Sequence, residues 1–324
     1  MSRAKNTTPR VCLMARLQTA KAQAVGAAAG TLRRLLLLGV ALITMATAAQ
    51  AQVAAPAATA TGTATATATA TPVMNCQANA IAIQGRSVWV DLKGAGKTTV
   101  MFEAGGGNES SVWSDIAPRI QAAGVRTLVY DRAGLGKSGF GPEPYGVDNE
   151  VATAKSVLTA CGISGPVILV AHSYGGVISL LLAGSDSRIA GVVLVEALVP
   201  KFLNQSEMDS VLAKYRPQYD EIRKLAPGLA KSMIPLMEAM PTTAKRLDAV
   251  NLPKALPIID IVAENTTIVT PQTTTLWRIA HASFVAGNSK REAIFAAGSS
   301  HKVMKDKPDL VVSAIEKMIG LVGR

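Results

Sequence analysis

Val-Ile-Leu-Val-Ala-His-Ser-Tyr-Gly-Gly, residues 167–176, joins a short apolar run to a helix-like segment. The run Val167–Val170 predicts a buried strand, and the residues after Gly176 predict a helix. A serine in such a strand-to-helix turn has its hydroxyl lifted clear of the backbone and lies at the positive end of the following helix. Ser173 therefore has the surroundings that a nucleophilic serine needs. The pattern is Gly-x-Ser-x-Gly with Ala171 at the first position, which keeps that residue small.

The chain after residue 73 alternates predicted strands with predicted helices. Apolar runs predict strands at 98–104, 125–130, 167–170, 191–195, 258–263 and 292–296. Periodic segments predict helices at 112–123, 148–160, directly after Ser173, 272–285 and 309–321. Residues 81–92 predict an antiparallel opening. This order is typical of an α/β protein with a parallel sheet and helices on both faces, in which functional sites gather at the carboxyl ends of the strands.

Three glycines follow one of these predicted strands, in Glu103-Ala104-Gly105-Gly106-Gly107. Glycine lets the backbone approach a ligand closely and present its N–H groups. Acyl transfer needs about two such donors to stabilise an oxyanion, each contributing on the order of 3 kcal/mol. We expect the amides of Gly106 and Tyr174 to form this oxyanion hole. The alternative is an ordinary glycine-rich turn.

A general base must take the serine proton, and the chain has three histidines. His172 lies inside the turn beside Ser173, where its neighbours predict a buried structural residue. His281 lies in a predicted helix and is expected to be a packed or surface residue. His301 lies in a small-residue loop after the last predicted strand, from which an imidazole can reach Ser173. His301 is therefore the predicted base.

Together these motifs resemble the α/β-hydrolase superfamily over about residues 80–322: the glycine loop, Asp131-Arg132-x-Gly-x-Gly-x-Ser138, the serine turn and Gly298-x-x-His301. The resemblance implies an eight-stranded, mostly parallel sheet and a helical cap inserted after strand six, at about 200–253. It also implies that a serine nucleophile excludes the dehalogenases and epoxide hydrolases, which use aspartate. Residues 130–139 are interpreted as scaffolding beside the site.

The acid of the catalytic triad is less well marked. The superfamily usually places it a few residues beyond strand seven, where this chain has Ala263-Glu264-Asn265-Thr266-Thr267. Glu264 lies close to that position but early. The other position is the end of strand six, where Glu196 ends an apolar run. Either carboxylate would orient the imidazole and stabilise its charged form. We favour Glu196, with Glu264 as the alternative and Asp260 third.

The N-terminal segment is predicted to direct export. Residues 1–51 contain seven of the 33 basic residues and none of the 22 acidic ones, which leaves about +4 of the formal +11 for the remainder. An apolar run from Leu35 to about Ala46, followed by Ala49-Gln50-Ala51, is typical of a cleaved secretion signal. The Ala/Thr-rich segment 52–72 predicts a linker, and the folded domain is expected at 73–324. We expect a periplasmic or extracellular protein.

Cysteine usage agrees with export. Cys12 leaves with the signal, and Cys76 and Cys161 remain. An even pair in an oxidising compartment predicts one disulfide, and two buried free thiols are the alternative.

The combined prediction is a secreted serine hydrolase that cleaves a small-molecule carboxylic ester through an acyl-enzyme. An amidase, peptidase or lactonase on the same triad is the alternative within this chemistry. A non-catalytic secreted binding protein with the same fold is the alternative from another class. We expect no cofactor, no metal, no nucleic-acid partner and no stable membrane span after signal cleavage.

Overall fold

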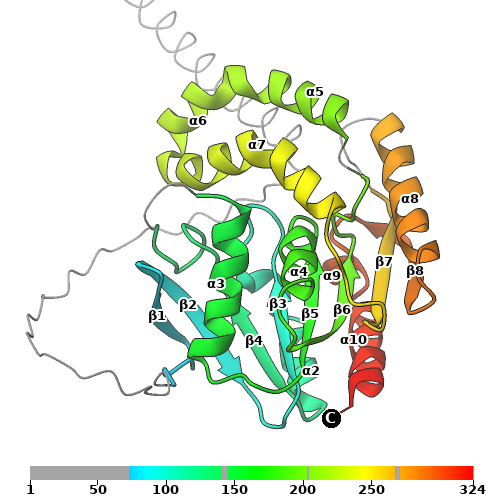
Figure 1. Ribbon diagram of the computed structural model, residues 1–324. Helices are drawn as coiled ribbons and strands as arrows, with labels where there is room; N and C mark the ends of the chain where they lie inside the picture. The colour runs from blue at the N-terminus through cyan, green and yellow to red at the C-terminus, as the bar shows by residue number, and fades with distance from the viewer. Residues whose placement is uncertain (1–72, 141–144, 203, 267–270, 324) are drawn as a thin grey trace, which may run out of the picture. The chain divides into compact units, whose positions relative to one another are not determined.

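The computed structural model describes residues 73–140, 145–202, 204–266 and 271–323 (Figure 1). The predicted signal and linker lie outside the described residues. An eight-stranded sheet contains β1 (Asn79–Ile83), β2 (Arg86–Lys93), β3 (Thr99–Glu103), β4 (Arg126–Tyr130), β5 (Val167–His172), β6 (Ile189–Val195), β7 (Ile258–Asn265) and β8 (Arg291–Ser300). The spatial order is β1-β2-β4-β3-β5-β6-β7-β8. The pairs β1–β2 and β2–β4 are antiparallel and the others are parallel, as the sequence predicts.

The central strands are buried on both faces, and alternate residues point to opposite sides. One face packs against α2 (Ala117–Ala122) and α10 (Pro308–Val322), through Val100, Phe102, Ile168, Val170, Val193, Val195, Ile259 and Ile261. The intervening residues therefore face α3 (Val147–Ala160) and α4 (Gly175–Ala183), which lie in front of the sheet in Figure 1. Each fully buried aliphatic side chain contributes about 1.5–3 kcal/mol, so this two-sided core holds the strand ends rigidly.

One predicted helix is wrong in its extent. Residues 112–123 do not form a single helix, because a short 3-10 helix η1 (Ser110–Trp113) ends before α2 begins. Pro118 lies in the first turn of α2, where its missing N–H costs nothing, whereas within a continuous helix it would remove a hydrogen bond. The last strand is also longer than predicted, since β8 continues to Ser300, directly before His301.

A helical segment follows β6 and lies over the carboxyl-terminal ends of the strands (Figure 1). It consists of α5 (Gln205–Tyr215), the 3-10 helix η2 (Arg216–Gln218), α6 (Tyr219–Leu225) and α7 (Pro227–Asp248). Arg216 donates three hydrogen bonds to the Glu238 carboxylate and so links η2 to α7. The chain then returns through β7, α8 (Pro271–Ala286), β8, α9 (Val303–Asp306) and α10.

The predicted disulfide joins Cys76 to Cys161. It ties the segment before β1 to the end of α3, where the Met74 amide also donates to the Ala160 carbonyl at 2.8 Å. The two cysteines are 85 residues apart in sequence, so the link removes much freedom from the unfolded chain.

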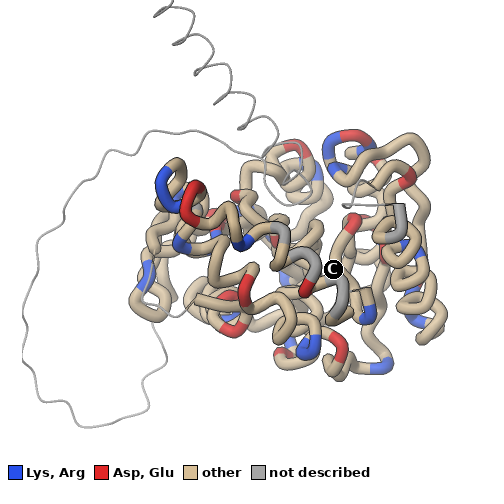
Figure 2. The backbone as a smooth tube through the Cα atoms, turned by 90° about the horizontal axis from the view of Figure 1, so that it is seen from above, with Lys and Arg blue, Asp and Glu red and all other residues tan. Residues whose placement is uncertain are grey.

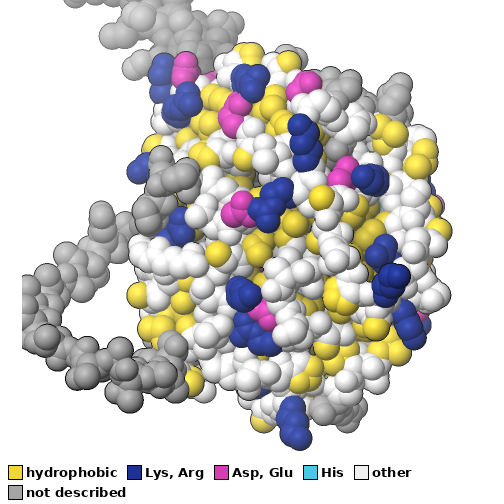
Figure 3. All heavy atoms as spheres, in the orientation of Figure 1, with side chains coloured by type: hydrophobic (Ala, Val, Ile, Leu, Met, Phe, Trp, Pro, Cys, Tyr) yellow, Lys and Arg dark blue, Asp and Glu magenta, His cyan; other side chains and the backbone are white. Residues whose placement is uncertain are grey.

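Charged side chains are scattered over the surface. Figure 3 shows Lys and Arg interspersed with Asp, Glu and uncharged side chains on one face, and Figure 2 shows the same mixture along the backbone seen from above. No helix within the described ranges is long and apolar enough to cross a bilayer.

Candidate active site

Ser173 lies in the sharp turn between β5 and α4, with a positive φ of 52°. This conformation is strained for a residue other than glycine, and it points the hydroxyl away from the sheet. The turn is possible because Gly175 has no side chain: a Cβ there would lie 2.6 Å from the Ala104 carbonyl oxygen. The Leu198 amide donates to the Ser173 carbonyl at 2.9 Å and fixes the turn from the side of β6.

His301 directly follows β8, and its Nε2 lies 3.0 Å from the Ser173 Oγ. This is hydrogen-bonding distance for a nucleophile and its general base. Two neighbours hold the histidine in place. His172 donates from Nε2 to the His301 carbonyl at 2.9 Å, and the Trp277 ring lies edge-on with its centroid 6.3 Å from that of His301. The structure thus brings the predicted nucleophile and the predicted base together.

His172 itself is unsuited to proton transfer. It is buried, and burial together with the nearby His301 lowers its pKa to about 3. The two imidazole centroids are only 4.8 Å apart, so a charge on one opposes a charge on the other. Because His172 stays neutral, positive charge in this pair can develop on His301 alone.

Glu196 lies on the other side of His301, at the carboxyl end of β6. Its Oε1 is 3.7 Å from the His301 Nδ1, and among the described residues neither atom has a hydrogen-bond partner. Such distances are often long before substrate binds and shorten in the reacting complex. The Glu196 Oε2 accepts from the Ala263 amide at 2.6 Å. Burial raises the pKa of Glu196, but interactions with His301, Ala263 and Thr266 outweigh burial and lower it, which keeps the carboxylate charged.

The other two candidate acids have different partners. Glu264 is exposed, and its Oε2 accepts from the Gly298 amide at 2.6 Å. Asp260 lies in β7, fully buried, with its Oδ2 2.7 Å from the Nδ1 of His281. The geometry thus favours Glu196 as the partner of His301. It also gives His281, which is buried, a partner that the sequence analysis did not identify.

The glycine loop after β3 packs against the serine turn. A Cβ on Gly105 would lie 2.8 Å from the His172 Nδ1, so only glycine permits this approach. Among the described residues, the amides of Gly106 and Tyr174 donate to no backbone carbonyl. Tyr174 is the N-cap residue of α4, where amides are free and the helix dipole favours negative charge. Both amides therefore remain candidates for oxyanion donors.

A buried charged cluster behind this loop was missed by the sequence analysis. It contains Glu103, Arg132 and Glu150, each at most 3 % exposed. The available signal was a glutamate ending an apolar strand and an arginine beginning a loop, neither of which identifies a partner. This cluster has only two carboxylates, and within the described ranges no three His, Cys, Asp or Glu side chains are placed to hold a metal ion.

Comparison with known proteins supports the resemblance. The sequence profile of the Alpha/beta hydrolase family matches residues 100–314. The protein YqjL of Bacillus subtilis (strain 168) is 27% identical over 239 residues, which cover 69% of this chain and 84% of YqjL.

Solved structures share the fold, among them an esterase and a dehalogenase. A thermophilic esterase from Thermogutta terrifontis superposes with a TM-score of 0.57 at 16% identity, over 76% of this chain and 98% of the esterase. The haloalkane dehalogenase DatA from Agrobacterium tumefaciens C58 gives 0.59 at 17% identity, over 75% of this chain and 96% of DatA. At such low identity these likenesses show the fold alone. Because the profile spans more than half of the sequence and the sheet has the matching order of elements, the chain belongs to the alpha/beta hydrolase family.

Proposed function

We propose that this chain is a serine hydrolase that cleaves carboxylic esters through an acyl-enzyme intermediate. The observation that carries the proposal is the 3.0 Å contact between the Ser173 Oγ and the His301 Nε2. Glu196 completes the set, because its charged and buried carboxylate lies on the Nδ1 side of the same ring. A serine, an imidazole and a carboxylate in this order are the parts that acyl transfer requires.

In the proposed reaction, His301 takes the proton of the Ser173 hydroxyl as its oxygen attacks the ester carbonyl carbon. The carbonyl oxygen becomes an oxyanion, which accepts hydrogen bonds from the amides of Gly106 and Tyr174. When the intermediate collapses, the alcohol leaves with the proton from His301 and the acyl group stays on Ser173. Water then attacks this ester, His301 takes its proton, and the carboxylic acid leaves as Ser173 regains its hydrogen.

Covalent labelling tests the nucleophile. A fluorophosphonate should phosphonylate the wild-type chain on Ser173, and Ser173→Ala should abolish labelling because it removes the hydroxyl that lies 3.0 Å from the His301 Nε2. Ser114→Ala, a change at an exposed serine directly after η1, is the matched control and should label at the wild-type rate. A wild-type chain that is folded but unlabelled would identify a binding protein and overturn the proposal.

The ester preference requires a separate measurement. A series of nitrophenyl esters of increasing acyl length, compared with the matched nitroanilides, should give turnover with the esters alone. Equal or faster turnover of the anilides would instead indicate the amidase alternative. Hydrolysis of lactones with no turnover of open-chain esters would indicate a lactonase.

Export is part of the same proposal. The disulfide between Cys76 and Cys161 supports it, because structural disulfides persist in oxidising compartments. Expression of the full chain followed by cell fractionation and N-terminal sequencing should yield a protein beginning near Gln52, outside the cytoplasm. Recovery from the cytoplasm of a protein with its N-terminus intact would contradict the proposal that the protein is exported.

A further inference from the structure

The peptide group between Gly105 and Gly106 has its carbonyl oxygen and its N–H on opposite sides, and Arg132 donates a hydrogen bond to the carbonyl oxygen. Arg132 donates through one terminal nitrogen to the Gly105 carbonyl oxygen and through the other to the Ala104 carbonyl oxygen. The Gly105 carbonyl and the Gly106 N–H belong to one rigid planar unit. A guanidinium that fixes the carbonyl therefore also fixes the direction of the proposed oxyanion donor. Its positive charge further polarises that unit, which makes the N–H a stronger donor.

The same guanidinium is linked to the other proposed donor. The Arg132 Nε lies 3.3 Å from the Glu150 Oε1, and the Tyr174 hydroxyl donates to the Glu150 Oε2 at 2.7 Å. Tyr174 supplies the second oxyanion amide, and its ring lies against Arg132 with the guanidinium carbon 5.8 Å from the ring centroid. Tyr145 donates to Glu150 as well, at 2.7 Å, and fixes the carboxylate from outside the site.

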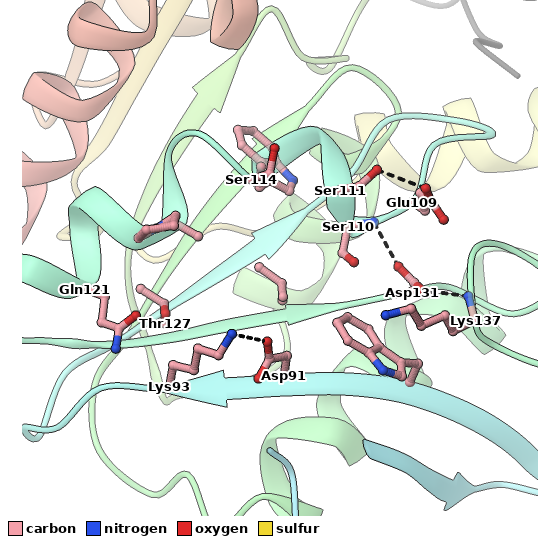
Figure 4. A pocket seen from close by; sticks show the side chains of 15 residues that line it. Asp91, Lys93, Glu109, Ser110, Ser111, Ser114, Gln121, Thr127, Asp131 and Lys137 are labelled. Carbon is pink, nitrogen blue, oxygen red and sulfur yellow. Dashed lines mark hydrogen bonds and ion pairs between the residues drawn. The ribbon is translucent and has the colours of Figure 1, made fainter. Parts of the chain in front are cut away.

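The start and the end of the glycine loop are held by adjacent residues. Arg132 bonds the carbonyls at its start, and Asp131 accepts from the Ser110 amide at 2.8 Å at its end. Asp131 also accepts from the Lys137 amide at 2.9 Å, and Figure 4 shows both bonds beside a cavity of about 460 Å³. The segment 104–110 is thus clamped, which a loop that only connects β3 to η1 does not require.

The cluster is costly for a fold to maintain. Glu103 bonds Arg132 at 2.6 Å and is 2% exposed, so three charged side chains, those of Glu103, Arg132 and Glu150, are buried together. Replacing such a cluster by apolar residues often leaves a protein equally stable, so stability alone does not account for it. We propose that Arg132 is a positioning residue, which holds the Gly106 amide directly and the Tyr174 residue through Glu150, so that both donors face the developing oxyanion. This inference rests on the proposed serine hydrolase function.

The decisive variant is Arg132→Lys, which keeps the charge but cannot bond two carbonyls and a carboxylate in one plane. With p-nitrophenyl acetate we expect kcat to fall about 10- to 100-fold, with KM within about threefold. The inhibition constant of a trifluoromethyl ketone, whose hemiketal carries an oxyanion, should rise by the same factor. If Arg132 had a purely structural role, the fall in kcat and the rise in the ketone inhibition constant would not be equal.

Arg188→Lys is the matched control, because Arg188 also bonds a carboxylate and two carbonyls, remote from Ser173. It should lower the melting temperature and leave kcat within about twofold. If Arg132→Lys changes kcat and ketone affinity no more than this control, the inference is wrong.

Tyr174→Phe decides the question if Arg132→Lys does not fold. It keeps the amide and removes only the bond to Glu150. We expect a loss in kcat of about 3- to 10-fold, with an equal loss in ketone affinity. Unchanged values would overturn the inference. Fluorophosphonate labelling of the wild-type chain distinguishes the proposed function from the role of Arg132. If the wild-type chain is not labelled, the serine hydrolase function is wrong. If it is labelled but the variants keep the wild-type kcat and ketone affinity, only the positioning role is wrong.

Discussion

Two histidine–carboxylate pairs lie at neighbouring strands of this sheet, and they differ in their separation, in the exposure of the histidine and in the contact at its Nε2. His281 and Asp260 are almost wholly buried, and 2.7 Å separates Nδ1 from Oδ2. His301 and Glu196 are 3.7 Å apart, and the histidine side chain is 13% exposed. The His301 Nε2 faces the Ser173 Oγ, whereas the His281 Nε2 has no hydrogen-bond partner within the described residues.

The difference shows that the tightness of a histidine–carboxylate bond is a poor guide to function. A short bond in a closed space holds α8 to β7, but it offers the ring no third group to exchange a proton with. In the looser pair the His301 Nε2 lies beside the proposed nucleophile, and the histidine side chain is partly exposed, as a general base requires. Three predictions test whether the two pairs have these different roles, and a fourth concerns His172, which lies beside His301.

The largest effect should separate the two histidines. His301→Gln removes the base and should lower kcat for a nitrophenyl ester by about 10⁴-fold, or roughly 5.5 kcal/mol. His281→Gln should leave kcat within about threefold, once rates are normalised to the folded fraction measured by circular dichroism. If the two variants lose activity equally, the pair buried between α8 and β7 takes part in the reaction, and its assignment as a structural pair is wrong.

The second effect should separate the candidate acids. Glu196→Gln retains the shape but not the charge, so the imidazolium loses its partner and kcat should fall about 10³-fold, or roughly 4 kcal/mol. Glu264→Gln should stay within about threefold, because Glu264 bonds the Gly298 amide and not the ring. Steady-state rates on one ester suffice. The opposite ranking would transfer the role of the acid to Glu264.

The third effect is on stability and not on rate. Asp260→Ala leaves His281 buried without its partner and should lower the free energy of unfolding by about 3 kcal/mol. Chemical denaturation measures this, while kcat of the remaining folded enzyme should stay within about threefold. Asp220→Ala removes an exposed ion pair with Arg223 and should cost less than about 0.5 kcal/mol. If Asp260→Ala greatly lowers kcat without lowering the free energy of unfolding, the Asp260–His281 pair takes part in catalysis.

The positions of the candidate catalytic residues could largely be predicted, because the sequence shows where several strands end. Apolar runs place the ends of β5 and β6 near Ser173 and Glu196, whereas β8 runs past its predicted end at residue 296 to Ser300, directly before His301. The sequence favours Glu196 as the acid but keeps Glu264 as an alternative. The choice between them depends on how β7 ends, since a shift in its pairing with β8 between Ala263 and Asn265 accompanies the contact of Glu264 with Gly298.

The buried charged groups were harder to predict. Asp260 inside an apolar strand indicates a buried partner, because an unpaired carboxylate there is costly, but it does not say which residue supplies it. Arg132 is similar: its partners come from β3, α3 and the glycine loop, which meet only in the folded chain. Local sequence patterns locate the proposed nucleophile and base, while contacts between distant parts of the chain decide which side chains support them.

The smallest predicted effect concerns His172, which has no carboxylate partner among the described residues and should remain neutral. Its folded pKa of about 3 lies below the value of about 6.5 expected in the unfolded chain, so the unfolded state binds the proton more readily. Stability from this residue is therefore complete above pH 6.5 and declines as the pH falls toward 3. Between pH 7.5 and 5, His172 should account for about 2 kcal/mol of lost unfolding free energy.

His172→Gln tests this, because glutamine can donate to the His301 carbonyl but does not titrate. Urea denaturation at both pH values should show a decline about 2 kcal/mol smaller in the variant than in the wild-type chain. Equal declines would mean that His172 takes a proton in the folded state. It would then place a second positive charge 4.8 Å from the His301 ring, oppose the imidazolium that Glu196 is proposed to stabilise, and weaken the assignment of His301 as the single charged member of this pair.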